Sequence, residues 1–117
     1  MRMWMVDPKK LCRKHLLGEH VECHMFVGTI LKGTSLLGYK EKGLIEVHNL
    51  KERHNRLSEE ILSRGYKHNS PLPEFKSFNY GSINSEENLK ILRVRCEECK
   101  RRINDDSRTT TFEIKTK

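Results

Sequence analysis

The chain has 117 residues, of which 35% are hydrophobic and 33% are charged. A chain of this length and polarity favours one domain with a modest core and excludes a second core of similar size. Its 23 Lys and Arg against 16 Asp and Glu give a formal net charge of +7. This charge favours a polyanionic partner, most simply nucleic acid, over a merely soluble basic protein.

The cysteines are Cys12, Cys23, Cys96 and Cys99. Residues 1–7 contain no apolar run long enough for a signal peptide, and no segment approaches a transmembrane span. We therefore expect a cytoplasmic protein without membrane association. In that compartment the cysteines are thiols or metal ligands rather than disulfides.

The first predicted helix runs from Asp7-Pro8 to about Lys32. Asp7 suits the N-cap, Pro8 suits the first helical position, and Gly33 provides a C-terminal stop.

Within this helix His15, Glu19 and Glu22 fall on one face, because residues three and four apart are neighbours on a helix. Taken alone, such a line of carboxylates is more typical of a solvated surface than of a site.

A second helix is predicted from the N-cap Asn49 to the C-terminal Gly65, with apolar residues at helical spacing. His54 falls on its charged face and is predicted to be on the surface. Between the two helices, residues 35–40 indicate a short helical piece, and residues 44–47 indicate a buried connector rather than a strand.

Residues 66–84 are predicted to form a long loop, interrupted by prolines and turn-forming residues. Its aromatic side chains Phe75, Phe78 and Tyr80 favour anchoring of the loop by burial. The alternative is that they offer stacking surfaces to unpaired bases.

The third helix is predicted from Ser85 to Ile103, followed by a polar tail at 104–117. A stripe of apolar residues at spacings of three and four includes Cys96 and Cys99, which favours their burial in the core. The overall prediction is an all-α fold: residues 1–117 form a single compact domain of about three main helices with long connecting loops.

Besides burial in the core, the sequence leaves two chemical roles open for the cysteines. Cys96-x-x-Cys99 has the spacing of a zinc half-site, whose second half would come from Cys12, Cys23, His20 or His24. Alternatively, Cys12 and His15 form a thiol–imidazole pair. A single Cys-x-x-Cys in an apolar stripe is weak support for metal, so the sequence predicts no metal and no cofactor.

The stretch Lys14-His15-Leu16-Leu17-Gly18-Glu19-His20-Val21-Glu22, preceded by Met1-Arg2, resembles the pyrimidine-dimer DNA glycosylase family. The likeness continues at residues 26–28 and 60–66, so it covers about half of the chain. The N-terminal pattern is the specific part, and the last third of the chain matches poorly.

The resemblance implies a mostly helical DNA-repair enzyme that binds and bends duplex DNA. An N-terminal amine attacks the sugar of the damaged nucleotide, and elimination from the resulting imine nicks the strand. By position, Met1 and Glu22 are the catalytic residues, as nucleophile and acid/base. An α-amine suits this role because its reference pKa of about 7.7–8.0 leaves it deprotonated more often than a lysine.

By position, Arg2 matches a DNA-contacting arginine, and His15 and Glu19 match residues that line the same cleft. The full set of predicted DNA-binding residues is Arg2, Arg13, Lys14, His15, Glu19, Lys100, Arg101 and Arg102. The expected partner is double-stranded DNA carrying a damaged base or an abasic site, bound by a monomer.

The chain also departs from the family pattern. The bulky Arg2 leads us to expect that Met1 is retained, whereas family members expose a threonine amine. Val21 and Met25 stand where the family has arginines that help to recognise the lesion. These substitutions motivate one alternative, a DNA-binding protein that has kept the scaffold without catalysis. A small interaction module stapled by zinc is a separate alternative.

Overall fold

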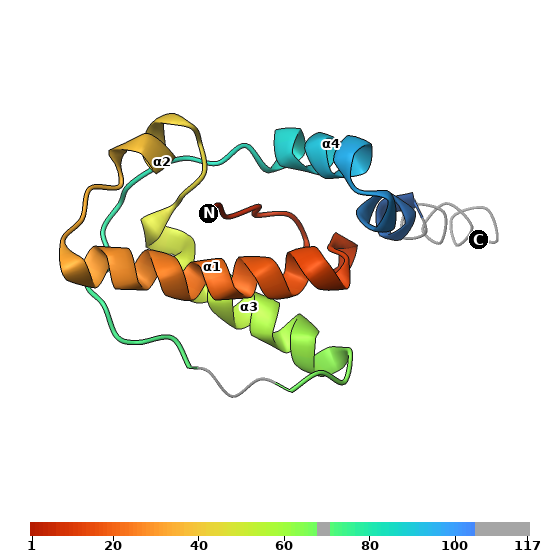
Figure 1. Cartoon of the computed structure of the whole chain (residues 1–117), viewed down its shortest axis with the longest axis horizontal. Helices are drawn as coiled ribbons and strands as arrows, with labels where there is room; N and C mark the ends of the chain where they lie inside the picture. Colours follow the sequence, from red (N-terminus) through yellow and green to blue (C-terminus); the bar gives the residue numbers. More distant parts are fainter. Residues whose placement is uncertain (68–70, 105–117) are drawn as a thin grey trace, which may run out of the picture.

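The computed structural model describes residues 1–67 and 71–104 (Figure 1). Over these residues the chain is helical and contains no strand, which confirms the all-α prediction. The predicted polar tail, from residue 105 on, lies outside the described residues. The elements are η1 (Pro8–Lys10), α1 (Arg13–Lys32), α2 (Leu37–Glu41), η2 (Val47–Asn49), α3 (Leu50–Ser63) and α4 (Ser85–Arg95), and residues 97–104 are also helical.

Helices α1 and α3 cross and pack against each other to form the centre of the molecule (Figure 1). Leu16, Phe26 and Val27 of α1 are fully buried, as is Leu57 of α3. Full burial of one such side chain contributes about 1.5–3 kcal/mol, so this pair of helices is the main source of stability. The predicted ends of both helices are confirmed, at Gly33 for α1 and next to Gly65 for α3.

The start of the first helix differs from the prediction. Asp7 accepts a hydrogen bond from the backbone N–H of Lys9, but it caps only the short helix η1. The backbone at Cys12 is extended, and its Sγ accepts the N–H of His15, so α1 begins at Arg13. A sulfur cap thus separates two helices where one was expected.

The third helix also differs, because it breaks at Cys96. The backbone there is extended, with φ −124° and ψ 112°, so α4 ends at Arg95 and helical structure resumes at residue 97. The side chain that caps α4 belongs to Asn84, which accepts the backbone N–H of Glu87 at 3.0 Å. The predicted stripe of one long helix is therefore divided between two segments that meet at an angle (Figure 1).

The first seven residues form an extended segment between α1 and α4 (Figure 1). Met3 is fully buried and Trp4 is 8% exposed, so the segment is part of the core. The N–H of Met3 donates to the carbonyl of Leu44 at 2.8 Å. The chain terminus is thereby held in a defined place.

The connectors wrap this core. Ile45 and Val47 are fully buried, which confirms the predicted buried connector. In the long loop Phe75 and Tyr80 pack against the core, whereas Phe78 remains 43% exposed. Of the three aromatic residues predicted to anchor the loop, anchoring by burial therefore holds for two, Phe75 and Tyr80.

Candidate functional site

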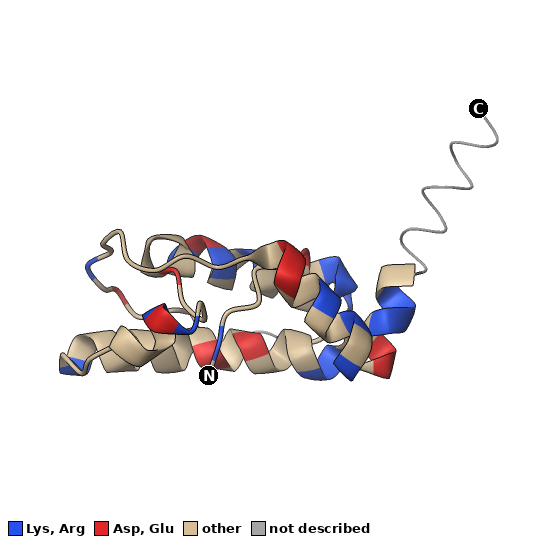
Figure 2. Ribbon diagram, turned by 90° about the horizontal axis from the view of Figure 1, so that it is seen from above, with Lys and Arg blue, Asp and Glu red and all other residues tan. Residues whose placement is uncertain are grey.

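Glu22 lies on α1 at the point where the chain terminus approaches the helix. The N-terminus lies beside the middle of α1 in both views (Figures 1 and 2). The backbone of Arg2 lies beside the carboxylate of Glu22 and favours its ionised form. Burial raises the pKa of the half-buried Glu22 carboxyl above its ordinary value, and the nearby positive charge of the Met1 α-amine partly offsets this rise. The structure thus brings together the two residues predicted to be catalytic.

The side chain of Arg2 contacts Trp4 and α4, and its charge also lies near enough to Glu22 to lower the pKa of that carboxyl group. Its guanidinium carbon lies 3.8 Å from the centre of the Trp4 ring. Its Nη2 donates to Oδ1 of Asn88 at 2.8 Å, and Nδ2 of Asn88 donates to the carbonyl of Trp4 at 2.9 Å. Arg2 was predicted to bind DNA, but its observed contacts hold the terminal segment in position.

Glu19 occupies a different environment from the one predicted. Instead of lining a DNA-binding cleft, its carboxylate is 1% exposed and forms a two-point ion pair with Arg53 of α3. The distances are 2.6 Å from Nε to Oε2 and 2.8 Å from Nη2 to Oε1. Because both groups are buried, the pair joins α1 to α3 and does not present a charge to a ligand.

The surface of α1 beside Glu22 is apolar. Val21 and Met25, which replace the expected arginines, are 54% and 50% exposed. Gly18, one turn before Glu22, has open space where a side chain would lie. This open face gives access to Glu22 without a cationic side chain on either side of it.

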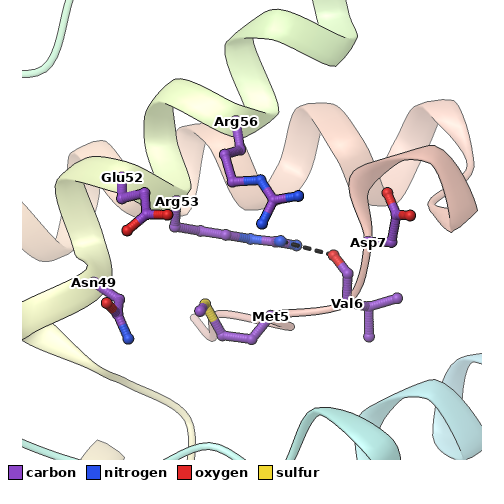
Figure 3. A pocket seen from close by; sticks show the side chains of 7 residues that line it. All are labelled: Met5, Val6, Asp7, Asn49, Glu52, Arg53 and Arg56. Carbon is purple, nitrogen blue, oxygen red and sulfur yellow. Dashed lines mark hydrogen bonds between the residues drawn. The ribbon is translucent and has the colours of Figure 1, made fainter.

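A small cavity of about 190 Å³ lies elsewhere, between the terminal segment and α3 (Figure 3). Arg53 crosses it and donates from Nη1 to the carbonyl of Val6 at 2.7 Å. Met5, at its edge, has a positive φ of 55°, a backbone conformation that L-residues rarely adopt. Neither Met1 nor Glu22 lines this cavity, so the candidate site is the open face of α1 rather than this enclosed space.

His15, predicted to line the cleft, faces sulfur atoms instead. Its Nδ1 lies 3.2 Å from Sγ of Cys12 and 3.5 Å from Sγ of Cys99. Its ring meets the Trp4 ring edge-on, with centroids 5.6 Å apart. Burial lowers the pKa of this imidazole. His15 therefore belongs to a cluster at the start of α1 that sequence reasoning did not assemble.

A second cluster corrects the prediction for His54. This residue is 3% exposed rather than on the surface, because its side of α3 faces α1. Its ring lies 4.7 Å from that of His20 and 4.9 Å from that of His24, measured between centroids. The sequence gives the helical spacing of His20 and His24, but a contact between helices is needed to add His54.

Comparison with known families gives one match: residues 1–74 match the family described as pyrimidine dimer DNA glycosylase. The chain belongs to this family. Membership implies a glycosylase that acts on damaged DNA, and the match contains the terminal segment, α1 and α3. Neither the curated proteins nor the solved structures give a match. Among the described residues, no helix is both long and apolar enough to cross a membrane.

Most of the basic side chains that were predicted to bind DNA lie in two places. They gather where α1 begins and along α4 and the helical segment that follows it (Figure 2). Arg13 and Lys14 are exposed at the first place, and Lys100 and Arg101 at the second. Arg102 differs, because its Nε donates to the carbonyl of Lys9 at 2.9 Å.

One basic residue near the site was missed by sequence reasoning. Arg95, at the end of α4, is exposed, and its charge lies close enough to Arg2 to lower the pKa of that guanidinium, although burial of Arg2 has the larger effect. The helical periodicity of α4 gave no signal for this role, because the sequence does not show which element covers the N-terminus.

Proposed function

We propose that the protein is a DNA glycosylase with abasic-site lyase activity, in which the α-amine of Met1 is the nucleophile and Glu22 is the acid/base. The observation that carries the proposal is the approach of the chain terminus to the middle of α1 (Figures 1 and 2), where the charge of the Met1 α-amine acts on the half-buried carboxyl group of Glu22. A free amine and a half-buried carboxylate on one accessible face are the groups that imine chemistry at a sugar carbon requires.

The proposed reaction passes through an imine between the α-amine and the sugar. The amine nitrogen bonds to C1′ of the damaged nucleotide as the glycosidic bond breaks, and the base leaves with the bonding electron pair. The nitrogen loses its protons and the sugar ring opens, which gives an imine. Removal of a proton from C2′ then expels the 3′ phosphate and cuts the strand. Glu22 moves protons in these steps and stabilises the cationic intermediate.

The raised pKa of Glu22 suits this role, because a carboxyl whose pKa lies closer to neutral both accepts and returns a proton readily. The positive charge of the Met1 α-amine lies near this carboxylate and favours its ionised form. The Arg2 side chain contributes indirectly, by tying the terminal segment to Asn88 of α4.

The proposed substrate is duplex DNA with a damaged pyrimidine or an abasic site, bound by one copy of the chain. The target nucleotide must leave the base stack for its C1′ to reach the amine. The exposed apolar side chains of Val21 and Met25 then contact bases and sugars next to the lesion. Phosphates are bound by the basic side chains Arg13, Lys14, Lys100 and Arg101, with Arg95 next to the site.

The exposed Val21 and Met25 also favour a second candidate, a DNA-binding protein that does not cut. One experiment separates the two: incubation of the protein, with its native N-terminus, with abasic-site duplex and borohydride. The reductant converts an imine to a stable amine, so the glycosylase proposal predicts a covalent adduct on the peptide that contains Met1.

Variants sharpen this experiment. Glu22→Gln is expected to slow strand cutting by about 10²–10⁴-fold, while Glu41→Gln, a change at an exposed carboxylate on α2, leaves it unchanged. An extension of the N-terminus blocks trapping, because the amine moves away from Glu22. DNA binding without trapping would establish the second candidate, and an adduct on a lysine would contradict the role of Met1.

A further inference from the structure

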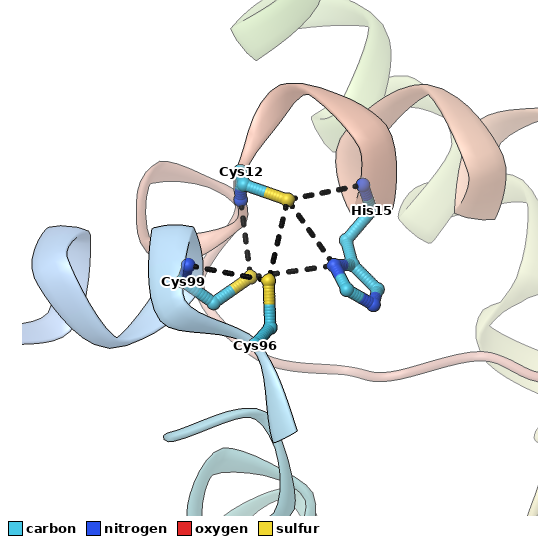
Figure 4. Close-up of side chains that lie close together, drawn as sticks. All are labelled: Cys12, His15, Cys96 and Cys99. Carbon is cyan, nitrogen blue, oxygen red and sulfur yellow. Dashed lines mark hydrogen bonds between the residues drawn. The ribbon is translucent and has the colours of Figure 1, made fainter. Parts of the chain in front are cut away.

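Two short motifs far apart in the sequence meet at one point in the fold. Cys12-x-x-His15 begins α1, and Cys96-x-x-Cys99 lies between α4 and the helical segment after it. Figure 4 shows all four side chains pointing toward one another. Their ligand atoms, three sulfurs and one imidazole nitrogen, all lie within 4.8 Å of one another.

The separations between these atoms are those of a tetrahedral metal site. With Zn–S bonds of about 2.3 Å and Zn–N bonds of about 2.0–2.1 Å, a tetrahedron has S–S edges of about 3.8 Å and S–N edges of about 3.5 Å. Sγ of Cys12 lies 3.8 Å from Sγ of Cys96. Nδ1 of His15 lies 3.2 Å and 3.5 Å from Sγ of Cys12 and Cys99.

Backbone hydrogen bonds support sulfur ligands in both motifs. In each motif the first cysteine stands on extended backbone, and its Sγ accepts the N–H of the residue three positions on. The N–H of Cys12 also donates to Sγ of Cys99 at 3.2 Å, which links the two motifs. Donors aimed at sulfur stabilise the thiolate form, which is the form that binds metal.

The other states of the cysteines fit less well. A disulfide has sulfurs about 2.05 Å apart, well short of the 3.8 Å between Cys12 and Cys96. Cys23 is an example of a cysteine that only fills the core. It is fully buried on α1, and among the described residues it belongs to no potential metal-binding group. In the cluster, by contrast, three sulfurs and one imidazole nitrogen lie close together at the break between α4 and the helical segment after it.

We propose that Cys12, His15, Cys96 and Cys99 bind a structural zinc ion. Three thiolates and Zn²⁺ carry a net charge of −1. The exposed charged residues adjoining the motifs, which are Arg13, Lys14, Lys100 and Arg101 against Glu97 and Glu98, remain net positive and offset it. With all four positions filled by protein ligands, the ion has no open site for chemistry and acts as a staple.

The staple fixes a part of the chain that the family match does not include. It attaches the segment that begins with α4 to the start of α1, and α4 supplies the Asn88 that holds Arg2 and Trp4. Zinc therefore holds α4 over the chain terminus. The proposal rests on the cluster alone and stands whether or not the chain cuts DNA.

Its test is to measure zinc bound to the full chain, purified without chelators, by mass spectrometry under non-denaturing conditions and by elemental analysis. We expect one zinc ion per chain, and its loss in both Cys96→Ser and Cys99→Ser. Cys23→Ala is the matched control, since it removes a buried cysteine outside the cluster and is expected to keep the zinc.

Cobalt(II) exchange provides a measurement on the unmutated chain. Cobalt bound by three thiolates and one imidazole shows the strong visible bands of a tetrahedral ion, with charge-transfer bands in the near ultraviolet. Absence of zinc after refolding with zinc, or a mass lower by two hydrogens that reports a disulfide, would overturn the proposal. So would zinc that persists in the serine variants but is lost in His24→Asn, since the ion would then lie in the histidine cluster.

Discussion

In residues 1–74, α1 and α3 bury aliphatic and aromatic side chains against each other along most of their length. In residues 75–104, the buried side chains are Asn88, Leu92, Cys99 and Ile103. The second region combines a smaller set of apolar contacts with three polar attachments: the amide of Asn88, the carboxylate of Glu46 and the sulfur cluster.

This difference coincides with the boundary of the family match. The matched region holds the proposed nucleophile and acid/base and has its own apolar core. The unmatched region covers the chain terminus, and it depends on a small number of specific contacts. The unmatched region buries fewer apolar side chains and relies more on specific polar contacts, so the two regions are expected to respond differently to mutation.

The largest expected effect is in the matched region, at the buried pair of Glu19 and Arg53. Arg53→Met leaves the Glu19 carboxylate buried without its partner, which costs about 3–5 kcal/mol, and urea unfolding measures the loss. Arg56→Met, at an exposed position one turn away, is the control. The double variant Glu19→Leu/Arg53→Met is expected to recover most of the stability, and equal losses in the two Arg variants would contradict this account.

Removal of zinc is expected to act mainly on the unmatched region. At a zinc concentration about 100 times Kd, binding stabilises the bound form by about 2.7 kcal/mol. Chelation is thus expected to speed hydrogen exchange in α4 by about a hundredfold, while exchange in α1 and α3 changes much less. Uniform acceleration along the chain would show that the two regions unfold as one.

At Gly81 the backbone of the unmatched region lies close to the backbone of the matched region at Ile45. A Cβ at this position would lie 2.0 Å from the carbonyl oxygen of Ile45, and its φ is +90°. Gly81→Ala is therefore expected to destabilise the protein by about 1–3 kcal/mol, measured by thermal unfolding. Gly38→Ala, where the added methyl meets open space, is the control and should show no such loss.

The pH dependence of strand cutting tests the site in the matched region. The pKa of Glu22 is raised in the folded protein, chiefly by burial. As the base that takes the C2′ proton, Glu22 must be ionised, so the rate of cutting falls by about tenfold per pH unit below this raised pKa. Conversion of preformed imine to cut strand, in single-turnover reactions, measures this step. A midpoint at or below the ordinary value for glutamate would contradict the assignment.

The smallest expected effect comes from two glycines inside α1, Gly18 and Gly28. Each has open space for a methyl group, so substitution by Ala is expected to stabilise the protein by about 0.5–1 kcal/mol. Gly18 lies one turn before Glu22, so Gly18→Ala is expected also to slow strand cutting, whereas Gly28→Ala leaves it unchanged. Thermal unfolding combined with cutting assays separates the two effects.

The sequence was sufficient for features that depend on local chemistry. Gly33 marks the end of α1 because it adopts the left-handed conformation there, with φ 73°. The bounds of α3 and the burial of Ile45 likewise follow from residues close in sequence. The order and spacing of residues 14–22 also sufficed to indicate the family.

Contacts between distant segments could not be predicted from the sequence. Arg53 lies 34 residues from Glu19, so nothing in the local pattern distinguished a buried ion pair from a solvated carboxylate. The apolar stripe through Cys96 and Cys99 concealed a helix break. Spacing alone held one signal that sequence reasoning missed. Cys12-x-x-His15 has the same spacing as Cys96-x-x-Cys99, and so supplies the second half of a zinc site.

The bond between Arg2 and Asn88 joins residues that are 86 positions apart, which has a consequence during synthesis of the chain. At about 5–20 residues per second, on the order of ten seconds separate the addition of these two residues by the ribosome. Throughout that interval the terminal segment has no α4 to dock against. The terminal segment with the proposed nucleophile is thus open first to the enzymes that trim or modify nascent chains, and it can dock on α4 only after Asn88 has been made.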